Sequence, residues 1–288
     1  MKGYFKNSSG FTQTIVLLLV CVGSLCFSMF VNVVYLQFFP DSLRATLFIQ
    51  NSLPLFLTAV GTQYLISDSS LVKAFGLYRP GWLLPVIGIL TFCVSGPLIE
   101  ILNEWNRHLV LPEFLKTMEE WMIASEKQVE DLTRRLLFPY SFGNLMLNIL
   151  QMGILAGLCE ELLFRGVIQK IMIRWTGNVH AGIWIAAIIF SAIHLQFFGF
   201  VPRLLLGAML GYLFALSGTL WVPVIAHMAN NILVVITQTH FQDRADQPEY
   251  PLWLGIISFA LICYGLYLTK RFSIGSRKGN LFSGSRDK

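Results

Sequence analysis

The stretch GLCEELLFRG, residues 157–166, places three charged side chains inside an apolar run that extends from about residue 145 to residue 173. The charged residues are Glu160, Glu161 and Arg165. A run of this length is long enough to cross a bilayer as a helix, and a charged side chain near the centre of a spanning helix costs about 2.5–3.5 kcal/mol on insertion scales. Three charges so close together therefore indicate a structural or chemical role.

On a helix, the two acidic residues point in different directions. Glu161 and Arg165 are four residues apart, so they lie on one face and neutralise each other. Glu160 points about 100° away from Glu161, on a face that carries the small residues Gly153, Ala156 and Gly157. The pattern predicts a structurally paired Glu161 and a Glu160 that is available for chemistry.

The composition of the whole chain is that of an integral membrane protein. Of its 288 residues, 55% are apolar and 13% are charged, whereas soluble domains carry about 25% charged residues. The apolar runs are continuous rather than alternating, which argues against a β-barrel. The net charge of +5 is dispersed and follows no aromatic stripe, so we expect no nucleic-acid partner.

The apolar runs predict the fold class, an all-α polytopic membrane helical bundle with about eight transmembrane helices and one amphipathic helix. The amphipathic segment is residues 113–136, where apolar residues recur at helical spacing among Glu, Lys and Arg. The eight expected spans are residues 14–36, 43–66, 82–102, 142–174, 179–198, 201–216, 220–240 and 252–268.

The chain reads as one domain between two short polar ends. We expect residues 1–13 to be a cytoplasmic N-terminus, residues 14–269 a single membrane-embedded domain with its motif core at 145–236, and residues 270–288 a basic, disordered cytoplasmic tail. The basic residues favour the side of the N-terminus, so the positive-inside rule places both termini in the cytoplasm.

Three pairs of polar or aromatic residues recur at four-residue spacing in the expected spans. They are Glu160-Glu161-x-x-x-Arg165, Phe190-x-x-x-His194 and His227-x-x-x-Asn231. Ionisable residues in membrane spans almost always face the bundle interior, so the three faces should converge. Glu160 and His194 are also equally far from Gly177 in the intervening turn, which places them at one depth in an antiparallel hairpin.

The residue types allow two mechanisms of hydrolysis. In the first, Glu160 and His194 hold and deprotonate a water, while His227 and Asn231 donate hydrogen bonds to the oxyanion of a peptide carbonyl. In the second, Glu160, His194 and His227 bind Zn²⁺ or another divalent metal from three separate helices, because the HExxH motif is absent. The residues alone leave both mechanisms open.

The three motifs, in this order on successive helices, resemble those of the CAAX-protease and bacteriocin-processing (CPBP, Abi) intramembrane proteases. The resemblance is strong over residues 145–236 and only general in the first three spans. It implies an intramembrane endopeptidase, a metalloendopeptidase or a glutamate-type protease, that acts on peptide or protein substrates at the lipid bilayer. It also implies a place in the bacterial inner (plasma) membrane.

The resemblance assigns roles to six residues of this chain. Glu160 becomes the water-activating acid with His194 beside it, Glu161 and Arg165 support the site, and His227 with Asn231 stabilises the oxyanion or binds a metal. Two alternatives use the same residues without proteolysis. One is a non-catalytic membrane protein that binds or scaffolds a partner, and the other is a transporter or proton relay.

Overall fold

A computed structural model describes residues 2–109, 111–138, 140–240 and 250–273. Within these residues all regular structure is helical and no strand is formed. The expected fold class, an all-α polytopic membrane bundle, is confirmed. The last residues of the expected cytoplasmic tail, 274–288, lie outside the described residues.

Six helical segments in the described part are long and apolar enough to cross a membrane. Several are built from consecutive pieces, because α-helix alternates with wider π-helical turns within one segment. The segments are α1 (Gly10–Phe38); α2, η1 and α3 (Leu43–Leu47, Phe48–Ser52 and Leu53–Ile66); α8, η3, α9, η4 and α10 (Phe142–Asn148, Ile149–Leu155, Ala156–Leu163, Phe164–Ile168 and Gln169–Thr176); η5 and α12 (Phe197–Gly199 and Phe200–Ser217); α13 (Trp221–His240); and α14 (Leu252–Ser273).

The third expected span is a bent pair of helices, which counts as a seventh crossing when the pair is taken together. It consists of α5 (Leu83–Cys93) and α6 (Gly96–Arg107), which meet at an angle of 41°. Pro97 stands in the first turn of α6. Proline lacks an N–H and therefore suits the start of a new helix better than the interior of a continuous one.

The fifth expected span is shorter than predicted. The apolar sequence continues to Phe198, but α11 (Val179–Ala192) has 14 residues and is below the length of an ordinary span. The chain turns immediately after it, with Leu195 in the left-handed region at φ 54°. His194 consequently lies just beyond the helix rather than within it, which corrects the expectation of a mid-helix histidine.

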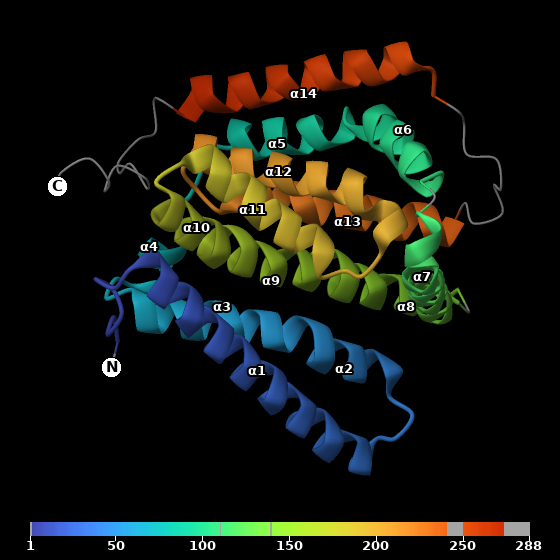
Figure 1. Cartoon of the computed structure of the whole chain (residues 1–288), viewed down its shortest axis with the longest axis horizontal. Coiled ribbons are helices and arrows are strands. Elements are labelled where there is room, and N and C mark those ends of the chain that lie inside the picture. The colour runs from blue at the N-terminus through green and yellow to red at the C-terminus, as the bar shows by residue number, and fades with distance from the viewer. Residues whose placement is uncertain (1, 110, 139, 241–249, 274–288) are drawn as a thin grey trace.

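The helices are arranged as a bundle with a separate hairpin along one side (Figure 1). The α1–α3 hairpin lies on one side of α9 and α10, α14 lies on the far side against α5, and α11 to α13 fill the middle. The beginning of α1 and the end of α14 are at the same end of the bundle. Consecutive spans cross the membrane in opposite directions, so an even number of crossings brings both ends to the same side. The number is even if the short α11 counts as a crossing.

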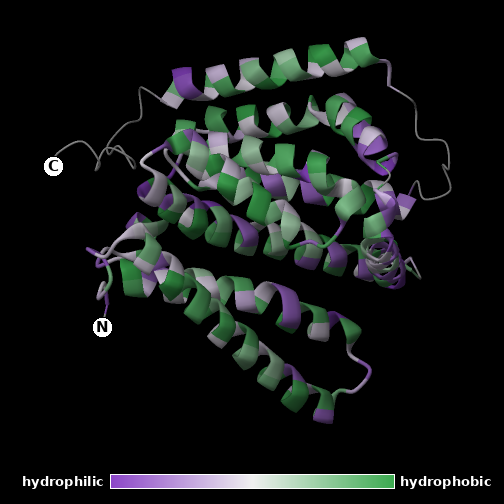
Figure 2. Ribbon diagram, viewed as in Figure 1, coloured by the Kyte–Doolittle hydropathy of each residue, from purple (hydrophilic) through white to green (hydrophobic). Residues whose placement is uncertain are grey.

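The amphipathic helix lies at the opposite end of the bundle. It is α7 (Lys116–Leu137), preceded by the 3-10 turn η2 (Glu113–Leu115), so its bounds agree with the predicted segment. Figure 2 shows mainly hydrophobic long helices and a more hydrophilic α7. The helix packs on α8 and η5, and the ring of Trp121 lies 5.5 Å from that of Phe197.

The two ends of the chain differ slightly from their predicted bounds. The first helix begins at Gly10, where the Ser9 side chain accepts a hydrogen bond from the Thr12 amide and caps the helix. The last helix continues to Ser273, so Lys270 and Arg271 belong to its final turn instead of a disordered tail. Cations in this position complement the negative end of the helix dipole.

Candidate active site

The predicted ion pair is present and fully buried. Nη1 of Arg165 lies 2.6 Å from Oε1 of Glu161, and the two residues are 1% and 0% exposed. The second guanidinium nitrogen of Arg165 donates a hydrogen bond of 2.7 Å to the carbonyl of Gly207 on α12. The charge of Arg165 is thus satisfied within its own helix and by a neighbouring one.

A second contact of the same kind lies one turn further along these helices. Gln169 donates to the carbonyl of Gly211 at 3.1 Å, as Arg165 does to Gly207. A Cβ at position 211 would lie only 2.9 Å from Oε1 of Gln169 and 2.8 Å from Cγ2 of Ile183 on α11, so glycine is required at this position. The sequence analysis missed this pair of contacts, although the Gly-x-x-x-Gly spacing in an apolar span is a known signal for helix packing.

The His227 imidazole connects the two acidic residues. Its Nδ1 lies 2.8 Å from Oε1 of Glu161, and its Nε2 lies 3.7 Å from Oε2 of Glu160. A carboxylate oxygen accepts hydrogen bonds, so Nδ1 carries a proton and Nε2 is the nitrogen presented to Glu160. Glu161 is therefore more than the partner of Arg165, because it also fixes the orientation of His227.

The ring of Phe190 packs against both histidines and the arginine. It makes edge contacts with His194 and His227, with centroids 5.0 and 6.0 Å away, and Cζ of Arg165 lies 4.9 Å above it. Its carbonyl oxygen is 2.7 Å from Nδ1 of His194. Since a carbonyl only accepts, a neutral His194 carries its proton on Nδ1 and leaves the lone pair of Nε2 free.

A cleft of about 700 Å³ lies between the α1–α3 hairpin and the main bundle, and three of the six predicted site residues line it. Glu160, His194 and Asn231 all line it, together with polar side chains of η1 and η3 and apolar side chains of α7. The Glu160 side chain is 16% exposed and that of Glu161 is 0% exposed. Adjacent acids therefore face different environments, one the cleft and the other the sealed interior, as the helical geometry predicted.

Asn231 lies in the cleft wall but not in the hydrogen-bonded network. Its amide donates to the carbonyl of Met152 at 3.3 Å, and it accepts from Asn230 at 3.4 Å. The contact with Met152 joins α13 to η3. Among the described residues, hydrogen bonds join Glu161, Arg165 and His227. Glu160 lies 3.7 Å from His227 and lines the same cleft as His194 and Asn231.

The donors of the metal-binding alternative are not gathered into one group in the described part of the chain. No set of three His, Cys, Asp or Glu side chains there is grouped closely enough to hold a metal ion. Nδ1 of His227 is engaged by Glu161 and Nδ1 of His194 by the Phe190 carbonyl, which leaves Nε2 of both rings free, as in metal-bound imidazoles. The predicted Zn²⁺ ligands Glu160, His194 and His227 therefore stay a hypothesis.

Two features near the cleft had no part in the sequence analysis. Wide π-helical turns, η3 and η4, stand immediately before and after the α9 segment that carries both acids, and such turns are frequent at functional sites. Arg203 on α12 donates to Gln196 at 2.6 Å, and Gln196 lines the cleft. Arg203 could have been recognised from the sequence as a charge at the start of an apolar span, whereas nothing in the sequence marks the π-helical turns.

A comparison with protein families finds a match to part of the chain. Residues 142–233, which include all six predicted site residues, match the model of the family described as "Type II CAAX prenyl endopeptidase Rce1-like". No solved structure matches the chain.

Two curated proteins of Bacillus subtilis (strain 168) are similar to part of the chain. "Uncharacterized protein YpbD" is 32% identical over 84 residues, which are 28% of this chain and 40% of that protein. "Putative membrane peptidase YdiL" is 30% identical over 92 residues, which are 32% of this chain and 37% of that protein. The matched region thus covers less than half of either relative.

Proposed function

From the Rce1-like domain formed by residues 142–233, we propose that this integral membrane protein hydrolyses peptide bonds of membrane-associated peptides or proteins, with Glu160 activating the attacking water. The observation that carries the proposal is the buried network of Glu161, Arg165 and His227, which holds an imidazole beside a cleft-facing carboxylate. A structural ion pair alone has no need of the second acid or of the histidine.

Glu160 is the base in this proposal. Its Oε2 lies 3.7 Å from Nε2 of His227, slightly too far for a direct hydrogen bond, and in this proposal the attacking water binds beside both groups. Glu160 takes one proton from that water as the oxygen attacks the peptide carbonyl, and later gives the proton to the amine that leaves. The lone pair of Nε2 in a neutral His194 accepts the water's other hydrogen.

His227 stabilises the charge that develops on the carbonyl oxygen. When it is doubly protonated, its Nε2–H donates to the oxyanion, while the Glu161 carboxylate stabilises the imidazolium through Nδ1. The Arg165 guanidinium balances Glu161 in turn. The Asn231 amide, which donates to the Met152 carbonyl in the structure, turns to the substrate and donates a second hydrogen bond to the oxyanion.

Substitution of the base tests the proposal. Glu160→Gln keeps the side-chain volume and removes the ability to accept the proton, so we expect processing to fall at least 100-fold, the scale of general-base catalysis. The measurement is comparative peptidomics of cells that carry the wild type or the variant, with the folded amount checked by size exclusion in detergent.

Glu120→Gln is the matched control, because Glu120 is an exposed acid on α7. It should process like the wild type. If folded Glu160→Gln protein yields the same peptides as wild type, the protease assignment is overturned, and the non-catalytic scaffold and proton-relay alternatives take its place.

A further inference from the structure

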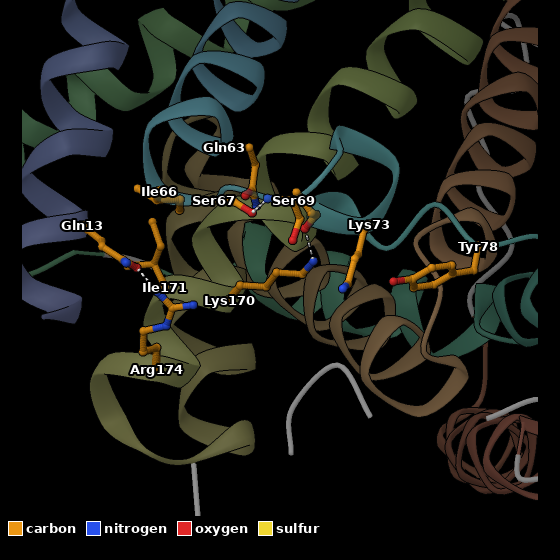
Figure 3. A pocket seen from close by; sticks show the side chains of 11 residues that line it. Gln13, Gln63, Ile66, Ser67, Ser69, Lys73, Tyr78, Lys170, Ile171 and Arg174 are labelled. Atoms are coloured by element: carbon orange, nitrogen blue, oxygen red, sulfur yellow. Dashed lines mark hydrogen bonds between the residues drawn. The ribbon is translucent and has the colours of Figure 1, made fainter. Parts of the chain in front are cut away.

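A second cavity, of about 350 Å³, lies at the end of the bundle where α1 begins and α10 ends (Figure 3). It is distant from the cleft of Glu160 and shares no lining residue with it. The start of α1, the end of α3, the short helix α4 (Leu71–Phe75) and the end of α10 all contribute to its wall. The polar side chains that matter are Gln13, Ser67, Ser69, Lys73, Lys170 and Arg174.

The charges of this cavity are all positive. Lys73, Lys170 and Arg174 line it, no acidic residue does, and none of the three is in an ion pair with an acid of the described chain. Asp68, between Ser67 and Ser69, forms an ion pair with Lys6, with Nζ of Lys6 2.7 Å from Oδ2 of Asp68. The hydrogen bond from Lys6 keeps the pKa of Asp68 below its usual value.

Two of the three cations are fixed in place by neutral acceptors. Nζ of Lys170 donates to the Ala74 carbonyl at 2.7 Å, and Nη1 of Arg174 donates to Oε1 of Gln13 at 2.7 Å. Neither bond neutralises a charge, and both leave further N–H donors unused. The Lys73 side chain is exposed and makes no hydrogen bond within the described residues.

The cavity lies where helices long and apolar enough to cross a membrane begin and end, and a bilayer surface is expected at such helix ends. The same elements expose large apolar side chains beside the cavity. Phe11 and Trp175 are 58% and 51% exposed, and Val72, next to Lys73, is 54% exposed. A molecule that offers an anionic group to the cations and an acyl chain to these side chains satisfies both features.

We propose that this cavity binds the phosphate group of an anionic phospholipid in the leaflet on the side of the N-terminus. Basic pockets between transmembrane helices recognise such headgroups through charge-assisted hydrogen bonds. Ser67, Ser69 and the free Lys73 ammonium supply donors around the phosphate. A soluble phosphate compound has the same anionic chemistry, and the acyl chain distinguishes the two.

The experiment titrates phosphatidylglycerol into the detergent-purified full chain and counts bound lipid by native mass spectrometry. Lys73→Gln is the first variant, because this exposed side chain has no structural partner and its loss leaves the fold intact. Arg174→Gln is the second. We expect each to lower the affinity about fivefold, the usual contribution of one basic residue near an anionic lipid.

Arg79→Gln is the matched control, because it removes one exposed cation at the same end of the bundle but outside the cavity. It should bind phosphatidylglycerol like the wild type, and phosphatidylcholine and inorganic phosphate should bind weakly to all forms. Equal losses in Lys73→Gln and Arg79→Gln would show unspecific charge attraction and overturn the site. Inorganic phosphate that competes as well as the lipid would assign the cavity to a soluble phosphate compound and overturn the lipid.

Discussion

Two adjacent glutamates in one helix have opposite surroundings. Glu161 is sealed between Arg165 and His227, whereas Glu160 faces a cleft. The helical repeat predicted that the two acids would diverge, because neighbouring positions are about 100° apart. It did not predict that His227, on another helix, would use Glu161 as its partner.

The buried network predicts a large stability effect for one substitution. Glu161→Gln keeps the shape but removes the charge that balances Arg165, and a buried ion pair that loses one partner destabilises a protein by about 3–5 kcal/mol. We expect a clear fall in the unfolding temperature in detergent. The double variant Glu161→Gln/Arg165→Gln should be less destabilised than the sum of the two single variants.

Glu104→Gln is the control for this prediction. Glu104 is half exposed, and its Oε2 lies 3.9 Å from Nη1 of Arg107. Ion pairs on the surface contribute only about 0–1 kcal/mol to the free energy of unfolding. A Glu161→Gln protein as stable as the Glu104→Gln protein would contradict the network described above.

At the scale of the element, the packing of α12 on α11 depends on glycine. A Cβ at Gly207 would lie 3.2 Å from Cδ1 of Phe190, and one at Gly211 would lie 2.8 Å from Cγ2 of Ile183, both on α11. A Cβ at Gly211 would also lie 2.9 Å from Oε1 of Gln169. Gly211 therefore allows both the approach of α11 and the contact with Gln169.

Gly211→Ala should destabilise the protein by about 1–3 kcal/mol, the usual effect of overpacking a closed core. Thermal unfolding in detergent measures it. Gly23→Ala is the control, since nothing lies within 4 Å of a Cβ there, and alanine in place of a helical glycine should be neutral or stabilising by up to about 1 kcal/mol. Equal stability of the two variants would contradict the close approach.

At the scale of the whole molecule, the bundle has two distinct ends. The N-terminus, the basic cavity and the end of α14 share one end, and α7 lies at the other. The excess of basic residues predicts that the first end lies in the cytoplasm. In this predicted orientation the amphipathic α7 lies at the outer surface, and its Val129, Leu132 and Leu136 side chains border the cleft.

Cysteine labelling of intact cells tests this orientation. In a variant free of native cysteines, a membrane-impermeant maleimide should label Glu120→Cys on α7 directly and Arg79→Cys only after the membrane is opened. Both positions are exposed, so access to the reagent depends on the membrane face alone. The reverse labelling pattern would show the opposite orientation.

The sequence by itself determined the membrane class, the helical fold, the amphipathic helix and the separation of Glu160 from Glu161. These follow from local properties, namely apolar run length and the helical repeat, which need no knowledge of neighbouring helices. It also identified the three motifs, since charges and imidazoles in apolar runs are conspicuous wherever they occur.

Only the tertiary structure decided the bend at α5–α6, the early end of α11, the contact of His227 with Glu161 and the basic cavity. Each depends on which helices pack together. The pattern of apolar residues does not reveal this, because in a membrane the helix faces that contact lipid are as apolar as those that contact protein. The cation at position 73 is about a hundred residues from those at positions 170 and 174, and the packing of α4 on α3 and η4 brings it to the same cavity.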